Sequence, residues 1–453
     1  MFDLTNFTPW VLFSDAGIIL GLLLIGKFCR AKIKLIQSLF IPPSLIAGIL
    51  ALAFGPNGLK WLPLSNNLGT YSAILIAVVF AALPLASPKF KVKEVAGKVG
   101  PMWAYSQFGM LFQWAVLGIF GILVLTPIFK VPEPFGIMCP VGFYGGHGTA
   151  AAMGATFGDM GWSDALSLGM TTATVGVVLG VICGVLFIKM ATKKRQTNYV
   201  TDFSELPNEL RSGLIPEEKR DDLGKGTVSS ISIEHLTFHI GIVFFAAFCG
   251  YILSKGVKMA WPMLDIPVFL SAYLVGLLAK FLLDKTGASY YVEQKTISSL
   301  SGTATDLLVT CGVGAINLKV VTANWLPLVV LLIVGIAATI FLVFYFARHL
   351  YKDDWFEKAI FAWGWWTGTM AIGIALLRIV DPKNDSHALD NYALAFLPCA
   401  PIEIILILSV PIAYNGGWLL WLCLGYLIIS LLILLLAKRV GWWIPKSQLK
   451  SKQ

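Results

Sequence analysis

Long apolar stretches are the feature that most limits how this chain of 453 residues folds. A transmembrane helix needs about 20 predominantly apolar residues. Stretches of this kind are centred near residues 20, 47, 78, 114, 177, 243, 273, 308, 336, 403 and 427. Because 57% of the residues are hydrophobic and only 13% are charged, no soluble core accounts for this composition. The sequence therefore predicts an all-α polytopic membrane protein.

The distribution of positive charge predicts the topology. Lysine and arginine gather on the cytoplasmic side of membrane proteins. Assigning them to alternate loops places 29 of the 34 on one side, provided that two apolar stretches, near residues 135–157 and 357–377, return to the side from which they enter. We therefore expect two re-entrant hairpins, an N-terminus outside, and a central loop and C-terminus in the cytoplasm. The net charge of +9 is a topology signal and indicates no nucleic-acid partner.

The chain divides at a polar segment near its middle. Residues 191–229 predict a solvated cytoplasmic linker, with a regulatory role as the alternative. Residues 1–190 and 230–415 predict two five-helix membrane repeats, because both contain an Ile-Pro at the second helix and a Gly-Thr-x-Ala in the hairpin. An odd number of spans per repeat makes the repeats inverted. Residues 416–453 predict one extra transmembrane helix and a basic cytoplasmic tail.

The glycine-rich stretch at residues 142–159 is the most informative part of the sequence. Non-helical backbone at membrane depth must be buried in protein or line a water-filled cavity, since lipid cannot satisfy its polar groups. Free amides at a half-helix N-terminus favour a carboxylate, and unwound carbonyls bind a cation. Close helix packing through small residues is the alternative. The predicted substrate-binding residues here are Gly145, Gly146, His147, Gly148 and Thr149.

The string Gly145-Gly146-His147-Gly148-Thr149-Ala150 resembles the first re-entrant motif of the bacterial glutamate:sodium symporters. The Ala173–Gly180 stretch and the Ile41-Pro42 helix opening are similar to the same family. The likeness covers residues 11 to about 414. It implies two inverted five-helix repeats, a homodimer in the bacterial inner membrane, and a substrate held between the hairpin tips.

The second half departs from that family's pattern. Tryptophans at positions 363, 365 and 366 replace small residues, and Glu403 lies several residues before the position of the family's acidic residue. These departures leave the substrate and the ion stoichiometry open.

Further candidate site residues come from the second hairpin and from polar groups in apolar helices. Gly368, Thr369 and Arg378 are predicted to bind substrate, although an arginine at a helix end also snorkels to the interface. A charge at bilayer depth by default marks an ion pathway. The predicted sodium-binding residues are Thr174, Asp306, Thr367 and Glu403.

The predicted function is sodium-coupled symport of glutamate or a similar small carboxylate. A proton-coupled transporter or a channel on the same scaffold is the alternative. An enzyme is not expected, because no GxSxG, HExxH, Walker or dinucleotide motif occurs in a suitable context. Seven cysteines stand singly without metal-ligand spacing, so we expect no cofactor and no transition metal, with Na⁺ as the coupling ion.

Overall fold

The computed structural model describes residues 7–38, 41–86, 99–199, 212–220, 222, 224–260, 266–381 and 385–445. Within these ranges the chain forms helices and no β-strand, which confirms the all-α prediction for the described part. The central part of the predicted linker and the end of the predicted basic tail lie outside the described residues.

Seven of the described helices are long and apolar enough to cross a membrane. They coincide with seven of the eleven apolar stretches of the sequence. Two of the other four stretches form the shorter apolar helices Pro43–Phe54 and Pro401–Asn415. The stretches near 273 and 308 form helices of 19 and 21 residues that also carry charged or hydroxyl side chains. The structure therefore supports a multi-pass membrane protein.

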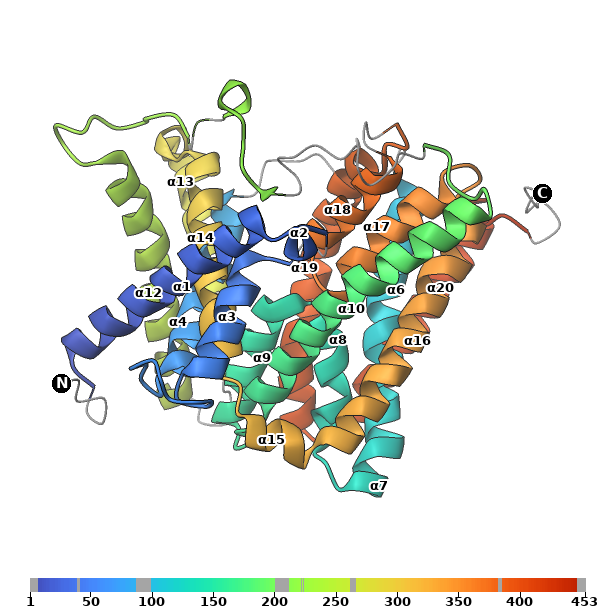
Figure 1. The fold of residues 1–453 in the computed structure, drawn as a ribbon, viewed down its shortest axis with the longest axis horizontal. Helices are drawn as coiled ribbons and strands as arrows, with labels where there is room; N and C mark the ends of the chain where they lie inside the picture. Colours follow the sequence, from blue (N-terminus) through green and yellow to red (C-terminus); the bar gives the residue numbers. More distant parts are fainter. Residues whose placement is uncertain are drawn as a thin grey trace. The chain divides into compact units, whose positions relative to one another are not determined.

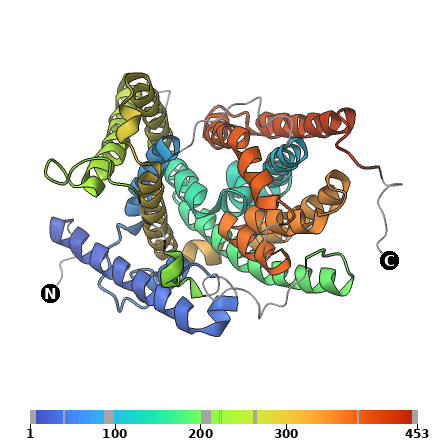
Figure 2. The same ribbon diagram turned by 90° about the horizontal axis from the view of Figure 1, so that it is seen from above.

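The described helices form two compact units, and each unit takes helices from both halves of the sequence. Figure 1 shows the helices of both units, and Figure 2 shows the same ribbon from above. The α-helices of the first unit are α1 (Pro9–Lys32) as far as Gly26, α3 (Pro43–Phe54), α4 (Leu68–Ala86), α12 (His235–Ala260), α13 (Val268–Thr286) and α14 (Gln294–Gly314).

Inside the first unit, the second helix of each sequence half packs against the third helix of the other half. Helix α3 packs on α14, where a Cβ at Gly48 would lie 2.7 Å from Cβ of Val313. Helix α13 packs on α4, where a Cβ at Gly276 would lie 2.5 Å from the carbonyl oxygen of Ala81. These glycines therefore let the helices approach closely, in the same way in both pairs.

An acidic residue that the sequence reasoning missed is also buried in this unit. Asp15 of α1 is 0% exposed. Its carboxylate accepts hydrogen bonds from the backbone N–H of Ser65 at 2.9 Å, from the Ser65 hydroxyl, and from the Tyr71 hydroxyl at 2.7 Å. Because its oxygens are satisfied by these donors, we assign Asp15 a structural role.

The second unit contains the remaining α-helices. The longer ones are α6 (Gly100–Phe120), α9 (Gly146–Asp159), α10 (Ala165–Lys193), α16 (Trp325–Leu350), α17 (Trp355–Thr367), α18 (Met370–Val380), α19 (Ala388–Asn415) and α20 (Leu419–Arg439). The shorter ones are α2 (Lys34–Ser38), α7 (Thr126–Phe129), α8 (Met138–Phe143) and α15 (Leu318–Ala323). A π-helical segment, Gly121–Leu125, and a 3-10 helix, Glu133–Ile137, connect α6 to α8.

Both stretches that the sequence predicted as hairpins are interrupted helices in this unit. We call α8 and α9, with residues 144–145 between them, the first broken helix. We call α17 and α18, with residues 368–369 between them, the second broken helix. Helices α10 and α19 each pack against both broken helices. The second unit is therefore organised around two breaks.

Candidate functional site

The two breaks meet at the middle of α10. Gly146 starts α9 with a φ of +64°, a backbone conformation that suits glycine. A Cβ at this position would lie 2.9 Å from the carbonyl oxygen of Gly368 in the other break. On α10, a Cβ at Gly176 would collide with the carbonyl oxygen of Thr367. The backbones of both breaks therefore lie side by side against one helix.

The first broken helix is attached to α10 by two polar contacts. His147 Nε2 and Thr174 Oγ1 lie 3.2 Å apart, within hydrogen-bond distance. The Thr172 hydroxyl donates to the carbonyl oxygen of Met138 at 2.7 Å. His147 is 4% exposed and Thr149 is 5% exposed, whereas Gly145, Gly148 and Thr174 are half-buried. Polar side chains of both α9 and α10 thus lie next to the first break.

The second broken helix forms a tight hairpin with tryptophan on its first arm. Helices α17 and α18 pack on each other, and a Cβ at Gly364 would lie 2.5 Å from the backbone nitrogen of Gly373. Trp363 is fully buried, and its Nε1 donates to the carbonyl oxygen of Gly180 in α10 at 2.8 Å. Thr369 caps α18, where its Oγ1 accepts from the backbone N–H of Ile372 at 3.4 Å.

The N-termini of α9 and α18 therefore both begin at the meeting point of the breaks. A helix N-terminus carries unpaired amides and a partial positive charge. Two of them together favour an anionic group such as a carboxylate. The predicted residues Gly145 to Thr149, Gly368 and Thr369 lie at or next to these two N-termini.

The remaining predicted residues fall in different places. Thr367 lies in the contact with α10, but its hydroxyl donates to the carbonyl oxygen of Trp363 at 2.7 Å. Arg378 is nine residues after Thr369, which is about 13 Å along the helix. Asp306 is exposed on α14 and belongs to the first unit. Glu403 lies on α19, in the same unit as the breaks.

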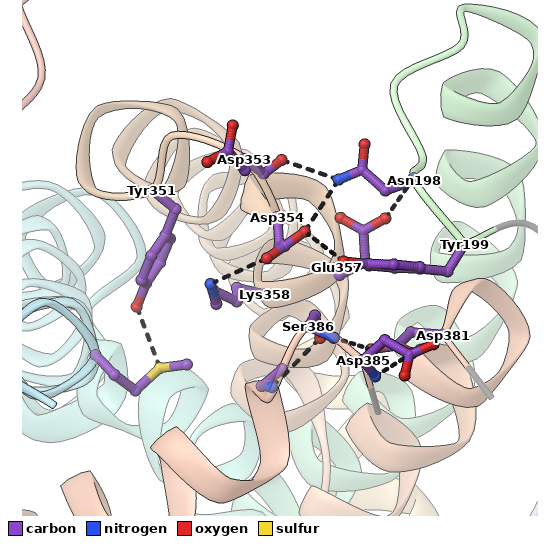
Figure 3. A network of polar contacts seen from close by, with 12 residues as sticks. Asn198, Tyr199, Tyr351, Asp353, Asp354, Glu357, Lys358, Asp381, Asp385 and Ser386 are labelled. Carbon is purple, nitrogen blue, oxygen red and sulfur yellow. Dashed lines mark hydrogen bonds and ion pairs between the residues drawn. The ribbon is translucent and has the colours of Figure 1, made fainter. Parts of the chain in front are cut away.

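A polar network that the sequence reasoning missed holds the start of α17 (Figure 3). The backbone N–H of Asn198 donates to Glu357 Oε1 at 2.7 Å, and the Asn198 side-chain amide donates to Asp354 Oδ1 at 3.1 Å. The Tyr199 hydroxyl donates to the same Asp354 oxygen at 3.2 Å. Burial and the neighbouring Asp354 carboxylate raise the pKa of Tyr199. The first residues after α10 are thus bound to the second broken helix.

Lys358 and Asp381 complete this region. Lys358 Nζ lies 3.8 Å from Asp354 Oδ2. The Asp381 carboxylate accepts from the backbone N–H groups of Asp385 at 2.8 Å and Ser386 at 2.9 Å (Figure 3). The contacts of Asn198 with Asp353 and Asp354 join residues about 155 positions apart in sequence, so no local motif predicts them.

Several buried polar atoms of the second unit have no hydrogen-bond partner among the described residues. Buried polar groups are normally paired. The unpaired atoms include the Tyr144 and Tyr392 hydroxyls, the side-chain amide atoms of Gln107, Gln113 Oε1, Trp114 Nε1 and Trp366 Nε1. No group of three or more His, Cys, Asp or Glu side chains with metal-site geometry occurs in the part of the chain that was described.

Comparison with known proteins assigns the family. The family model described as sodium/glutamate symporter matches residues 14–373, which include both breaks and most of the two units. A search of curated proteins found no match. The matched region covers well over half of the chain and confirms the resemblance that the first break suggested. The chain belongs to the sodium/glutamate symporter family.

Proposed function

We propose that this membrane transporter carries out sodium-coupled symport of glutamate or a similar small carboxylate. The observation that carries the proposal is the meeting of two broken helices at α10, where the N-termini of α9 and α18 begin next to each other. Paired half-helix N-termini suit a carboxylate, and the interrupted backbone supplies carbonyl oxygens for a cation. The family match supports the same function.

In this proposal the two breaks are the tips of re-entrant hairpins. Gly145, Gly146, His147, Gly148, Thr149, Gly368 and Thr369 bind the substrate at the tips. Arg378 lies in the last turn of α18, far from the break, so it has the least structural support among the proposed substrate-binding residues. Thr174, Thr367 and Glu403 of the second unit contribute to sodium binding, whereas Asp306 belongs to the first unit and is not part of this group.

We further infer that residues 1–190 and 230–415 are inverted repeats. The packing of α3 on α14 and of α13 on α4 relates the two halves pairwise. In the second unit, α10 and α19 each pack against both broken helices. A homodimer in the bacterial inner membrane, with the N-terminus outside and the C-terminus in the cytoplasm, completes the proposal.

The test is uptake of radiolabelled glutamate into proteoliposomes that contain the purified protein. An inward sodium gradient should drive accumulation, and collapsing it should stop accumulation. Uptake driven by a proton gradient without sodium would replace sodium coupling by proton coupling. Sodium-driven uptake of a competing dicarboxylate or amino acid, without glutamate uptake, would keep the mechanism and change the substrate.

The matched variants are Gly368→Leu and Gly158→Leu. A side chain at Gly368 would press on Val177 of α10, with its Cβ 3.0 Å from Cα of that residue, whereas Gly158 at the far end of α9 has no atom within 4 Å of the Cβ position. We expect Gly368→Leu to abolish uptake and Gly158→Leu to retain it. Wild-type uptake by Gly368→Leu would contradict the position of the site at the breaks.

A further inference from the structure

The helix that precedes each broken helix in the sequence packs against the other broken helix. Helix α6 comes before the first broken helix, and a Cβ at Gly109 of α6 would collide with the ring of Trp366 in α17. Helix α16 comes before the second broken helix, and a Cβ at Gly335 of α16 would collide with Cys139 Sγ in α8. Helices α6 and α16 therefore connect the two broken helices in a reciprocal way.

A hydrogen bond joins α6 to α16 one turn beyond these glycines. Gln113 Nε2 of α6 donates to Thr339 Oγ1 of α16 at 2.7 Å. The Thr339 hydroxyl donates in turn to the carbonyl oxygen of Gly335 at 2.7 Å. Gln113 is 1% exposed and Thr339 is 0% exposed. The bond therefore lies in a low-dielectric interior, where a hydrogen bond is stronger than in water.

The Gln113 amide also reaches the second break. Its Nε2 lies 3.4 Å from the carbonyl oxygen of Trp366, within hydrogen-bond distance. In a continuous helix this carbonyl would accept from the backbone N–H of residue 370. Gly368 and Thr369 have non-helical backbone angles, which interrupt that pattern. Gln113 therefore supplies a donor where the break removes one.

The orientation of the Gln113 amide follows from its neighbours. Thr339 Oγ1 gives its proton to Gly335, and the Trp366 carbonyl oxygen can only accept, so both atoms require the amide nitrogen. Gln113 Oε1 is left buried without a hydrogen-bond partner among the described residues. A buried unpaired oxygen costs free energy, so an apolar side chain would serve packing alone better. The bonds of the nitrogen therefore explain a glutamine at this position.

We propose that Gln113 is a positioning residue, which holds the second break in place next to the first. It touches no ligand. Its amide fixes the carbonyl end of α17 at Trp366, and its hydrogen bond to Thr339 connects that point, by way of Gly335, to α8 of the first broken helix. The consequence for transport rests on the proposed function, in which the ligand is bound by both breaks together.

Hydrogen exchange of the full-length protein in detergent tests the positioning and requires no transport. The reporters are amides at the second break, where the N–H of Gly368 donates to Trp365 and that of Thr369 donates to Gly364. Gln113→Met keeps the length of the side chain and removes the amide. We expect the reporter amides to exchange about tenfold faster in this variant, because local opening no longer breaks the buried hydrogen bonds of Gln113. The measurement is mass spectrometry of peptides that span residues 364–373.

Tyr105→Phe is the matched control, because it removes a buried hydrogen bond between the same two helices. The Tyr105 hydroxyl donates to the carbonyl oxygen of Val343 in α16 at 2.8 Å, and phenylalanine keeps the ring next to that of Trp366. We expect both variants to lower the melting temperature. Exchange at the second break should stay at the wild-type rate in Tyr105→Phe. Equal exchange rates at the break in Tyr105→Phe and Gln113→Met overturn the proposal.

Thr339 tests the connection to the first broken helix. Thr339→Val removes the acceptor of the Gln113 bond and should also speed exchange at the second break, but less than Gln113→Met does, because the contact with Trp366 remains. Thr339→Ser keeps the hydroxyl and should restore the wild-type rate. Equally fast exchange in Thr339→Ser and Thr339→Val overturns the part of the proposal that assigns positioning to this hydroxyl.

Uptake separates this proposal from the proposed function. In proteoliposomes with an inward sodium gradient, we expect Gln113→Met to raise the substrate KM about tenfold at an unchanged maximal rate per folded protein. Tyr105→Phe should keep the wild-type KM, as a residue that only joins the two helices would. An unchanged KM in Gln113→Met overturns its role at the binding site. Absence of glutamate uptake by the wild-type protein rejects the proposed function alone, because exchange still decides whether Gln113 holds the break.

Discussion

The two broken helices occupy corresponding places in the two halves of the chain, but they are held in different ways. The first has a polar, glycine-rich break, and His147 and Thr172–Thr174 connect it to α10 through side-chain contacts. The second has few polar contacts at its break and is fixed by buried tryptophan and by the close approach of α17 and α18. The comparison teaches that polar side-chain contacts hold the first break, whereas buried aromatic packing and close backbone approach hold the second.

The largest effect should come from separating the arms of the second broken helix. In Gly364→Ala, the new methyl group would meet the backbone of Gly373, which cannot move aside as a flexible side chain does. We expect a loss of stability of about 3 kcal/mol, at the upper end for overpacking, and a corresponding loss of uptake. The measurement is the melting temperature of the purified protein together with proteoliposome uptake.

The control for this variant is Gly158→Ala in the first broken helix, where the Cβ position is open. It should behave as the wild type. If Gly364→Ala were equally stable, the second broken helix would not depend on the contact between its arms, and the contrast between the two breaks would disappear.

The next effect concerns the backbone of the first break. In Gly146→Ala, the positive φ of 64° costs about 1–2 kcal/mol for a residue with a Cβ. The methyl group would also press on the Gly368 carbonyl oxygen at 2.9 Å. We expect uptake at low substrate concentration to fall about tenfold while the protein remains folded, which size-exclusion chromatography and initial-rate uptake would show. A fall in stability without a change in uptake by the folded fraction would count against a ligand-contacting break.

A smaller effect should follow from Trp363→Phe. The variant keeps an aromatic ring but removes the Nε1 hydrogen bond to the Gly180 carbonyl oxygen, which contributes about 1 kcal/mol. We expect a lower melting temperature and an unchanged substrate KM, because the tryptophan holds shape and contacts no ligand. Trp421→Phe, at a residue 72% exposed on α20, is the control. A raised KM would place Trp363 in the binding site.

The smallest effect is expected at Thr174. Thr174→Val removes the hydroxyl that lies 3.2 Å from His147 Nε2 and should raise the substrate KM or the sodium requirement roughly fivefold, equivalent to about 1 kcal/mol. Thr174→Ser keeps the hydroxyl and should restore the wild-type values. Equal kinetics for all three proteins would remove this hydrogen bond from the function.

The sequence predicts the helical class, the places of both breaks and the family, because each depends on local patterns. Gly145-Gly146-His147 marks a break, since adjacent glycines in an apolar run permit the backbone conformations that interrupt a helix. The contact between Gly146 and Gly368 could not be predicted, because it joins segments more than 200 residues apart. For the same reason, the contacts of Trp365 with Tyr144 and Tyr392 are visible only in the folded chain.

The grouping of helices is equally hidden from the sequence. Composition suggests a division at the polar linker, but the compact units each combine helices from both sides of it. The role of Asp15 could not be predicted from the sequence for a different reason. It lies in an apolar helix as Glu403 does, and only the hydrogen bonds from Ser65 and Tyr71 reveal that its charge is already satisfied.

The attachment of Asn198 and Tyr199 to Asp354 and Glu357 has a consequence for how the polypeptide can be divided. Residues that follow α10 bind α17 non-covalently. The linker is therefore not the sole connection between α10 and α17. The gene could be split after the codon for Tyr199 and the two fragments co-expressed. Their assembly would then be guided by this docking point together with the α10 interface, as in a complementation pair.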